Sequence, residues 1–336
     1  MKRLWVIVFP FFFAACALID DDLSVCGEEL VIDYQLQLHT ELSMQLQTEL
    51  MTETELPVRQ ALEKWLEPIF TETAKDVDLR FFSSETDELR HHIYEIINDK
   101  RTSYTLQLPK ENYMHLGVAN IADNDQVRLQ GEKHSESLKL SLIDGLNVPS
   151  LSTGVFTARQ HMEIGDSSAN FAVRLYMANS AVALVLDTTI CDSLVSISGT
   201  VIGSAISFSV RDSIYTYDHS RAIILNELPI ERKMDDGIKK MRRAEEITDT
   251  YACMVVSTFP TEDDKSWSMI VHVMLQGNRR TTTTLTIDEP LAAGTLRIIR
   301  VHVDAQGGIQ PDDGQKEVAA SVELDWNNGT EIEIEF

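Results

Sequence analysis

The stretch of sequence that decides the fold is LVIDYQLQL, residues 30–38. Its side chains alternate with a period of two, which places every second one on the same face of a β-strand. The segment is long for a strand, and the alternation continues beyond residue 38 at Leu42, Met44, Leu46 and Leu50. We therefore predict an N-terminal strand that turns one apolar face toward a core. That face consists of Leu30, Ile32, Tyr34, Leu36 and Leu38.

Similar alternation recurs along the chain in short runs that end at Gly, Asp, Asn or Pro, residues that favour turns. It predicts strands at residues 77–81, 104–108, 171–177, 181–186, 194–197 and 205–210. Six further strands are predicted at residues 251–258, 267–275, 282–287, 296–303, 318–324 and 331–336.

Only three segments have the spacing of a helix. Residues 57–70 begin with Pro57 and place Leu62, Trp65, Leu66 and Ile69 at steps of three and four, which makes one apolar stripe. Residues 87–98 repeat this spacing, so we expect two connecting helices laid against a sheet. The third segment, residues 235–246, is mostly charged and is expected to be a solvated excursion.

These elements predict an all-β protein built from two β-sandwich domains with a few connecting helices. The charged segment that begins at residue 231 separates the two groups of strands, so we place the domain boundary near residue 220. The N-terminal domain is then residues 28–220 and the C-terminal domain residues 221–336.

The first residues predict export and a lipid anchor. Lys2 and Arg3 precede an apolar run at residues 4–13, and two alanines then stand before Cys16. A charged start, a short apolar run and small residues are typical of a secretory signal, and a cysteine at that place is where a bacterial lipobox has its acylated residue. Residues 1–15 are thus the predicted signal peptide, and ordinary secretion is the alternative. Acyl chains on Cys16 would hold the protein on a membrane.

Residues 16–27 form a predicted lipidated spacer that contains Asp20, Asp21 and Asp22. An acidic run so close to the lipid resembles the export tag of lipoproteins that Bacteroidetes move to the outer face of the outer membrane. A plain solvated spacer is the alternative. The expected location is the cell outer membrane, exposed at the surface.

The composition excludes nucleic acid as a partner. The formal charge is −24, and loss of Lys2 and Arg3 with the signal peptide makes it −26. Affinity for phosphate backbones requires Lys and Arg to displace counterions. If Cys16 carries lipid, Cys26, Cys191 and Cys253 remain, and a disulfide between two of them is possible without the sequence choosing the pair.

Signatures of catalysis are absent from the sequence. It contains no G-x-S-x-G, no P-loop, no H-E-x-x-H and no G-x-G-x-x-G. No two cysteines stand at C-x-x-C spacing, and His91 and His92 would diverge on a helix. We predict neither an enzyme nor a metal or cofactor site.

Several segments together resemble one known family. They are Cys16, the block DDDLS at residues 20–24, Cys26, the strand that follows, TLRIIRV at residues 295–301 and WNNG at residues 326–329. With these the whole chain is similar to the FimB-type fimbrial anchor lipoproteins of Bacteroidetes, the minor fimbrium anchoring subunits of type V pili. The segments 57–70 and near residue 240 have no counterpart that we can name.

The resemblance implies a pair of transthyretin-like β-sandwiches and assembly by β-strand complementation, with fimbrial stalk subunits as partners. Stalk subunits of such pili lose an N-terminal strand to an arginine-specific protease, and a neighbour's strand fills the groove. An anchor keeps its own strand. Between Arg3 and Arg59 this chain has no Lys or Arg, so such a protease has no site there.

The expected function is therefore an outer-membrane lipoprotein that anchors, and by that limits, a fimbrial polymer. The last strand, with Ile332, Ile334 and Phe336 on one face, either stays in its own sheet or is donated to a neighbour. A fimbrial tip or stalk subunit is one alternative. A surface glycan-binding lipoprotein is another, which requires exposed aromatic side chains, whereas Trp65, Trp267 and Trp326 lie in patterns typical of burial.

Overall fold

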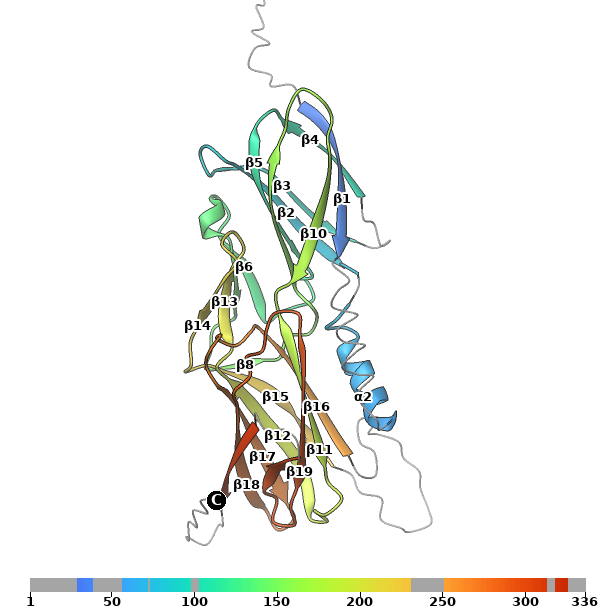
Figure 1. The fold of residues 1–336 in the computed structure, drawn as a ribbon, viewed down its shortest axis with the longest axis vertical. Coiled ribbons are helices and arrows are strands. Elements are labelled where there is room, and N and C mark those ends of the chain that lie inside the picture. Colours follow the sequence, from blue (N-terminus) through green and yellow to red (C-terminus); the bar gives the residue numbers. More distant parts are fainter. Residues whose placement is uncertain are drawn as a thin grey trace, which may run out of the picture.

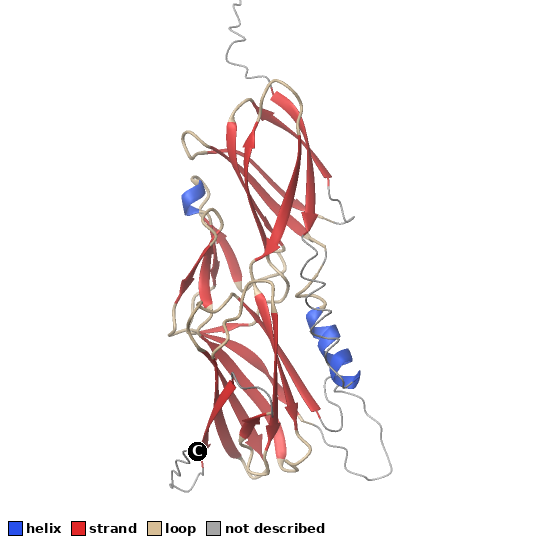
Figure 2. Cartoon of the chain, viewed as in Figure 1, coloured by secondary structure: helices blue, strands red, loops and turns tan. Residues whose placement is uncertain are grey.

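The structure is a computed structural model that describes residues 29–38, 56–71, 73–97, 103–230, 251–312 and 318–325. It consists mainly of strands, which form two elongated lobes stacked end to end (Figure 1). Helices are few (Figure 2). The prediction of an all-β fold with a few helices is confirmed.

The N-terminal lobe is built from a single seven-stranded sheet. Its second half includes β1, the strand that the alternation at residues 30–38 predicts. The strand order is β3 (Leu89–Ile96), β2 (Asp76–Ser83), β5 (Asn112–Ala119), β9 (Phe156–Glu163), β10 (Asn170–Met177), β1 (Glu29–Leu38) and β4 (Ser103–Pro109).

The C-terminal lobe contains two sheets that enclose the larger apolar core. The four-stranded sheet has the order β16 (Tyr251–Thr258), β11 (Ser180–Asp187), β19 (Leu296–Val303) and β20 (Ile309–Pro311). The six-stranded sheet has the order β21 (Val318–Asp325), β18 (Arg279–Ile287), β17 (Trp267–Leu275), β12 (Leu194–Ile202), β15 (Ala222–Pro229) and β8 (Asn147–Pro149).

A small fourth sheet lies beside the junction of the lobes (Figure 1). It has the order β14 (Ile214–Tyr217), β13 (Ala205–Ser209), β7 (Lys139–Leu142) and β6 (Val127–Gln130), and a short 3-10 helix, η2 (Ser135–Ser137), precedes β7. Leu138 and Leu140 from this sheet share a buried cluster with Leu116 and Val118 of β5. The small sheet therefore packs over the outer face of β5 in the N-terminal lobe.

Helix α2 (Leu56–Leu66) confirms the helix predicted at residues 57–70 in its first part, but it ends at Leu66 and residues 67–70 form a turn. Its buried residues Val58, Ala61, Leu62 and Leu66 follow the helical period and make one stripe. The stripe packs on β16 and β11 of the C-terminal lobe. As a result β11 is covered on both faces, and seven of its eight residues are buried.

The helix predicted at residues 87–98 is wrong, because this segment contains the edge strand β3. Its burial alternates strictly, with Arg90, His92, Tyr94 and Ile96 outward. The spacing of the apolar residues in this segment predicted a helix wrongly, because Ile96 is 60% exposed and so does not belong to a buried face. The segment forms a strand because it pairs antiparallel with β2, from Asp76 opposite Ile96 to Phe82 opposite Leu89.

The domain boundary near residue 220 does not agree with the strand pairing. β11 pairs with β16 and β19, and β12 pairs with β17, so strands from both sides of residue 220 share the sheets of the C-terminal lobe. The chain passes for the last time from the N-terminal to the C-terminal lobe between β10 and β11, at residues 178–179, after β8 has already joined the six-stranded sheet. Pairing between distant segments, which no local composition reveals, sets this boundary.

The signal peptide, the spacer, the charged segment 235–246 and the last strand, 331–336, lie outside the described residues. Within the described residues, no helix is long and apolar enough to span a membrane. Cys191 and Cys253 are both buried, and no disulfide joins them.

Candidate functional site

The N-terminal strand β1 lies inside its sheet, with a neighbour along each side. It runs parallel to β10, with Asp33 opposite Asn170 and Leu38 opposite Leu175. On its other side it is antiparallel to β4, from Glu29 opposite Pro109 to Gln35 opposite Ser103. The chain therefore supplies this strand to its own N-terminal lobe, and β4 becomes the edge of the sheet.

The predicted apolar face of β1 points inward where the structure describes its side chains. Ile32 and Tyr34 are 1% and 0% exposed. For the other three predicted residues only the backbone is described: Leu30 lies opposite Leu108, Leu36 opposite Val173 and Leu38 opposite Leu175.

Tyr34 connects β1 to the opposite layer of the lobe. Its hydroxyl is hydrogen-bonded to Nε2 of His115 in β5, and its ring meets that of Phe81 in β2 edge to face at 6.3 Å. β5 and β2 are not neighbours of β1 in the sheet order. The sheet is therefore folded over on itself, and β1 closes its apolar interior.

The tautomer of His115 follows from its second contact. Its Nδ1 lies 3.0 Å from the carbonyl oxygen of Arg80, which can only accept a hydrogen bond. Nδ1 therefore carries the proton, and Nε2 accepts the hydrogen bond that the Tyr34 hydroxyl donates. The imidazole also stacks on Phe81 at 4.5 Å.

Both partners of this hydrogen bond are neutral at ordinary pH. Complete burial lowers the pKa of His115 to about 4. Burial raises the pKa of Tyr34 well above its usual value, and the electrostatic effect of the nearby Tyr104 is a smaller cause in the same direction. The contact is thus a neutral hydrogen bond in an apolar interior, which would cost free energy to break without a replacement partner.

A buried polar network joins the two lobes. Asn179 accepts a hydrogen bond from the backbone N–H of Val155 at 2.8 Å and donates one to Oγ of Ser257 at 2.7 Å. The Ser257 hydroxyl in turn donates to the carbonyl oxygen of Ser180 at 3.0 Å. These contacts tie the segment before β9 and the connection between β10 and β11 to strands β11 and β16 at the junction.

β1 begins at one end of the long axis, and β21 ends near the other (Figure 1). The chain thus enters the N-terminal lobe at one pole and leaves the C-terminal lobe at the opposite pole. Cys16, Asp20, Asp21 and Asp22 precede the first pole in sequence, and Ile332, Ile334 and Phe336 follow the second, all of them outside the described residues.

Other sequence predictions can be placed as well. His91 and His92 point to opposite faces of β3, where His91 is half-buried and His92 is exposed. Within the described residues, no group of three metal-ligating side chains occurs. Trp267 is 2% exposed, as its pattern predicts, but Trp65 is 38% exposed, so its predicted burial is wrong. Trp326 lies outside the described part of the chain.

His115 is the site residue that sequence reasoning missed. It lies on β5, where burial is nearly continuous, so alternation gives no signal. Both faces of β5 are covered, one by β1 and the other by the small sheet, as the clusters around Tyr113 and Leu116 show.

Comparison with known proteins finds the same fold in solved structures of Bacteroides proteins. No family model and no curated protein sequence matches the chain. Two solved structures share its fold: a candidate polysaccharide-binding protein of Bacteroides thetaiotaomicron, with TM-score 0.52, 11% identity and coverage of 91% of this chain and 99% of that one, and a candidate adhesin of Bacteroides ovatus, with TM-score 0.52, 10% identity and coverage of 91% and 96%.

The fimbrial anchor protein Mfa2 from Porphyromonas gingivalis also aligns, over 91% of this chain and 99% of that one, with 12% identity and a TM-score of 0.45. The two Bacteroides structures, at identities this low, establish a common fold and nothing finer.

Proposed function

We propose that this protein is an outer-membrane lipoprotein that anchors a fimbrial polymer and ends its growth. The observation that carries the proposal is the position of β1 between β10 and β4 of its own chain. A subunit that polymerises by strand complementation must present an empty groove to a neighbour's strand. Here the chain's own strand occupies that groove.

The two poles of the molecule fit this role. Cys16, the proposed acylation site, precedes Glu29 by 13 residues in sequence, and β1 begins at Glu29 at one pole of the molecule. Two or three acyl chains hold a protein on a membrane almost permanently, because each buried methylene contributes about 0.8 kcal/mol. The opposite pole is then directed away from the membrane. The expected partners are fimbrial stalk subunits, and the shared adhesin fold agrees with a location at the cell surface.

A tip or stalk subunit of the same system is the rival, and it predicts proteolytic trimming. The experiment is N-terminal sequencing and intact-mass spectrometry of the protein recovered from assembled fimbriae. We expect a chain that starts at acylated Cys16. A start beyond residue 38 would exclude the anchor.

The lipid is tested by replacing Cys16. We expect Cys16→Ala to release fimbriae into the medium, as deletion of the gene should, whereas the control Cys26→Ala should keep them on cells. Fimbriae of normal length that stay attached to cells without this protein would contradict the proposal.

The last strand has two possible roles, and a truncation after Asn328 separates them. If Ile332, Ile334 and Phe336 are donated to a neighbour, the truncated protein stays folded on the membrane but loses its fimbriae. If they stay in their own sheet, its thermal stability falls.

A further inference from the structure

A pocket lies where the N-terminal lobe meets the small fourth sheet. β9 and β10 pair only at Thr157 with Tyr176 and at Phe156 with Met177, and then diverge. The pocket has a volume of about 350 Å³, within the range of small-molecule sites. Its wall is completed by the β13–β14 hairpin and by Ala293.

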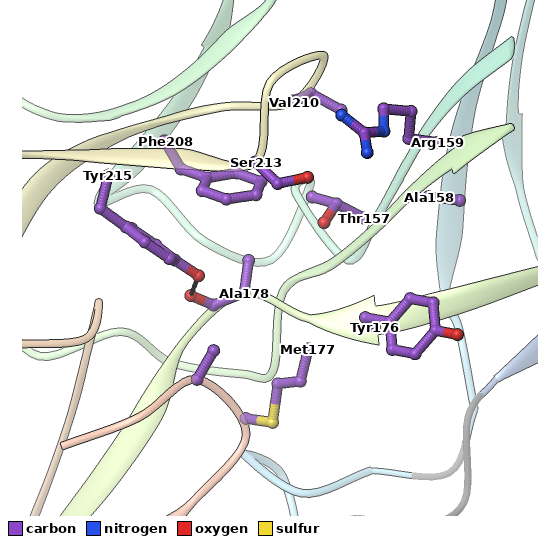
Figure 3. Close-up of a pocket in the computed structure, with 11 residues that line it drawn as sticks. Thr157, Ala158, Arg159, Tyr176, Met177, Ala178, Phe208, Val210, Ser213 and Tyr215 are labelled. Atoms are coloured by element: carbon purple, nitrogen blue, oxygen red, sulfur yellow. Dashed lines mark hydrogen bonds between the residues drawn. The ribbon is translucent and has the colours of Figure 1, made fainter.

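Aromatic rings form two sides of this pocket. Figure 3 shows Phe208 and Tyr215 on one side and Tyr176 on the other. The rings of Phe208 and Tyr215 lie 4.6 Å apart, and the Tyr215 hydroxyl donates to the carbonyl oxygen of Ala178 at 2.8 Å, which fixes its position. Tyr176 is 53% exposed and leaves its ring accessible at the rim.

Besides the two tyrosine hydroxyls, the polar side chains that line the pocket are the guanidinium of Arg159 and the hydroxyls of Thr157 and Ser213. Arg159 donates from Nη1 to the carbonyl oxygen of Arg211 at 2.7 Å. A guanidinium has five N–H groups, so Arg159 can still donate to a ligand. None of the residues that line the pocket is acidic, although the chain has 53 Asp and Glu residues.

We propose that this pocket binds a saccharide that carries a carboxylate, such as a sialic or uronic acid. The exposed ring of Tyr176 can pack against the C–H face of a pyranose, while the guanidinium of Arg159 pairs with the carboxylate. Thr157 and Ser213 supply hydroxyls for the sugar hydroxyl groups. The pocket does not involve β1, so this site is independent of anchoring.

An extended peptide is the other ligand that the diverging strands could accept, by pairing with β9 between Ala158 and Glu163. The chemistry of the lining favours the sugar. A peptide strand binds through backbone hydrogen bonds and would not depend on Arg159, whose side chain is exposed on β9.

The test is binding to the full mature chain, measured by calorimetry and saturation-transfer NMR with N-acetylneuraminic acid, glucuronic acid, glucose and acetate. We expect an acidic sugar to bind about tenfold or more tightly than glucose or acetate, the scale of one charge-assisted hydrogen bond. Equal binding of acetate, or no binding of either acidic sugar, would overturn the proposal.

Variants assign the binding to this pocket. Arg159→Gln should lower the affinity for the acidic sugar about tenfold, to that of glucose, and Tyr176→Ala should weaken both sugars, while Tyr176→Phe should bind normally. The matched control is Arg174→Gln, exposed on β10 outside the lining. Thermal melts verify folding of each variant. Unchanged binding by folded Arg159→Gln and Tyr176→Ala, or binding only of an extended peptide, would refute the assignment.

Discussion

The hydroxyl of Tyr34 donates a hydrogen bond to Nε2 of His115 across the interior of the N-terminal lobe. Tyr34 lies on β1 and His115 on β5, 81 residues away in sequence and separated by two strands in the sheet. The bond therefore holds the first strand against the opposite layer, in addition to the ladders that bind its edges. Retention of this strand is what the anchoring proposal requires.

Tyr34→Phe should destabilise the protein without changing its shape. The substitution keeps the ring but leaves Nε2 of His115 buried without its hydrogen bond, which costs about 1–3 kcal/mol. Urea denaturation measures the loss. The control is Tyr94→Phe, because Tyr94 is 52% exposed, and it should change stability little. Equal losses in both variants would contradict the role of the hydrogen bond.

Stability should fall as the pH decreases from 6.5 toward 4. Burial lowers the pKa of His115 from 6.5 to about 4, so between these values the unfolded chain binds a proton that the folded chain does not. The contribution is complete above about pH 6.5, and about 3 kcal/mol is lost by pH 4. His115→Gln should flatten this part of the stability profile. His161→Gln, at an exposed position of β9, should leave it unchanged.

Gly154→Ala should destabilise the junction of the lobes, while Gly165→Ala should not. A methyl group at position 154 would stand 2.1 Å from the carbonyl oxygen of Ile69, whereas one at position 165 would meet nothing within 4 Å. Forcing atoms into a packed site costs about 1–3 kcal/mol. Thermal melts of both variants provide the comparison, and equal melting temperatures would disprove the close contact.

The thiol of Cys253 should react very slowly in the folded protein. Burial raises its pKa to about 12, and only the thiolate reacts readily. Cys253 shares a buried cluster with Leu62 of α2. Leu62→Ala should cost about 2–5 kcal/mol and speed labelling of Cys253, because the helix opens more easily.

The measurement is alkylation followed by peptide mass spectrometry, which distinguishes Cys253 from the other thiols. Glu63→Ala is the control, since Glu63 is exposed on the same helix. Labelling that is fast in the unmodified protein, or equally slow in Leu62→Ala, would show that α2 does not protect this thiol.

Strands with one clear apolar face could be predicted from the sequence, and so could α2. For β1 the alternation placed Ile32 and Tyr34 inward, as the structure has them. For α2 the predicted spacing of Leu62, Leu66 and Ile69 marked buried positions, although Trp65, predicted in the same stripe, is exposed. In both cases a repeated local pattern reports which side avoids water.

The pattern failed where burial does not follow polarity. On β3 the apolar residues Ile93 and Ile96 point to opposite faces, and Ile96 is exposed at the edge of the sheet, so their spacing imitated a helix. On β5 both faces are covered, so burial is nearly continuous along the strand. The sequence pattern therefore did not distinguish His115 from its neighbours.

The sequence by itself determined that this chain forms strands, which side of β1 is apolar, and that a signal and an acylation cysteine are predicted ahead of it. Only the tertiary structure decided that β1 lies between β10 and β4, that Tyr34 reaches His115, and that strands on both sides of residue 220 share sheets. The physical reason is that alternation depends on neighbouring residues alone. Strand pairing joins segments more than a hundred residues apart, and the hydrophobic effect that drives it does not specify a partner.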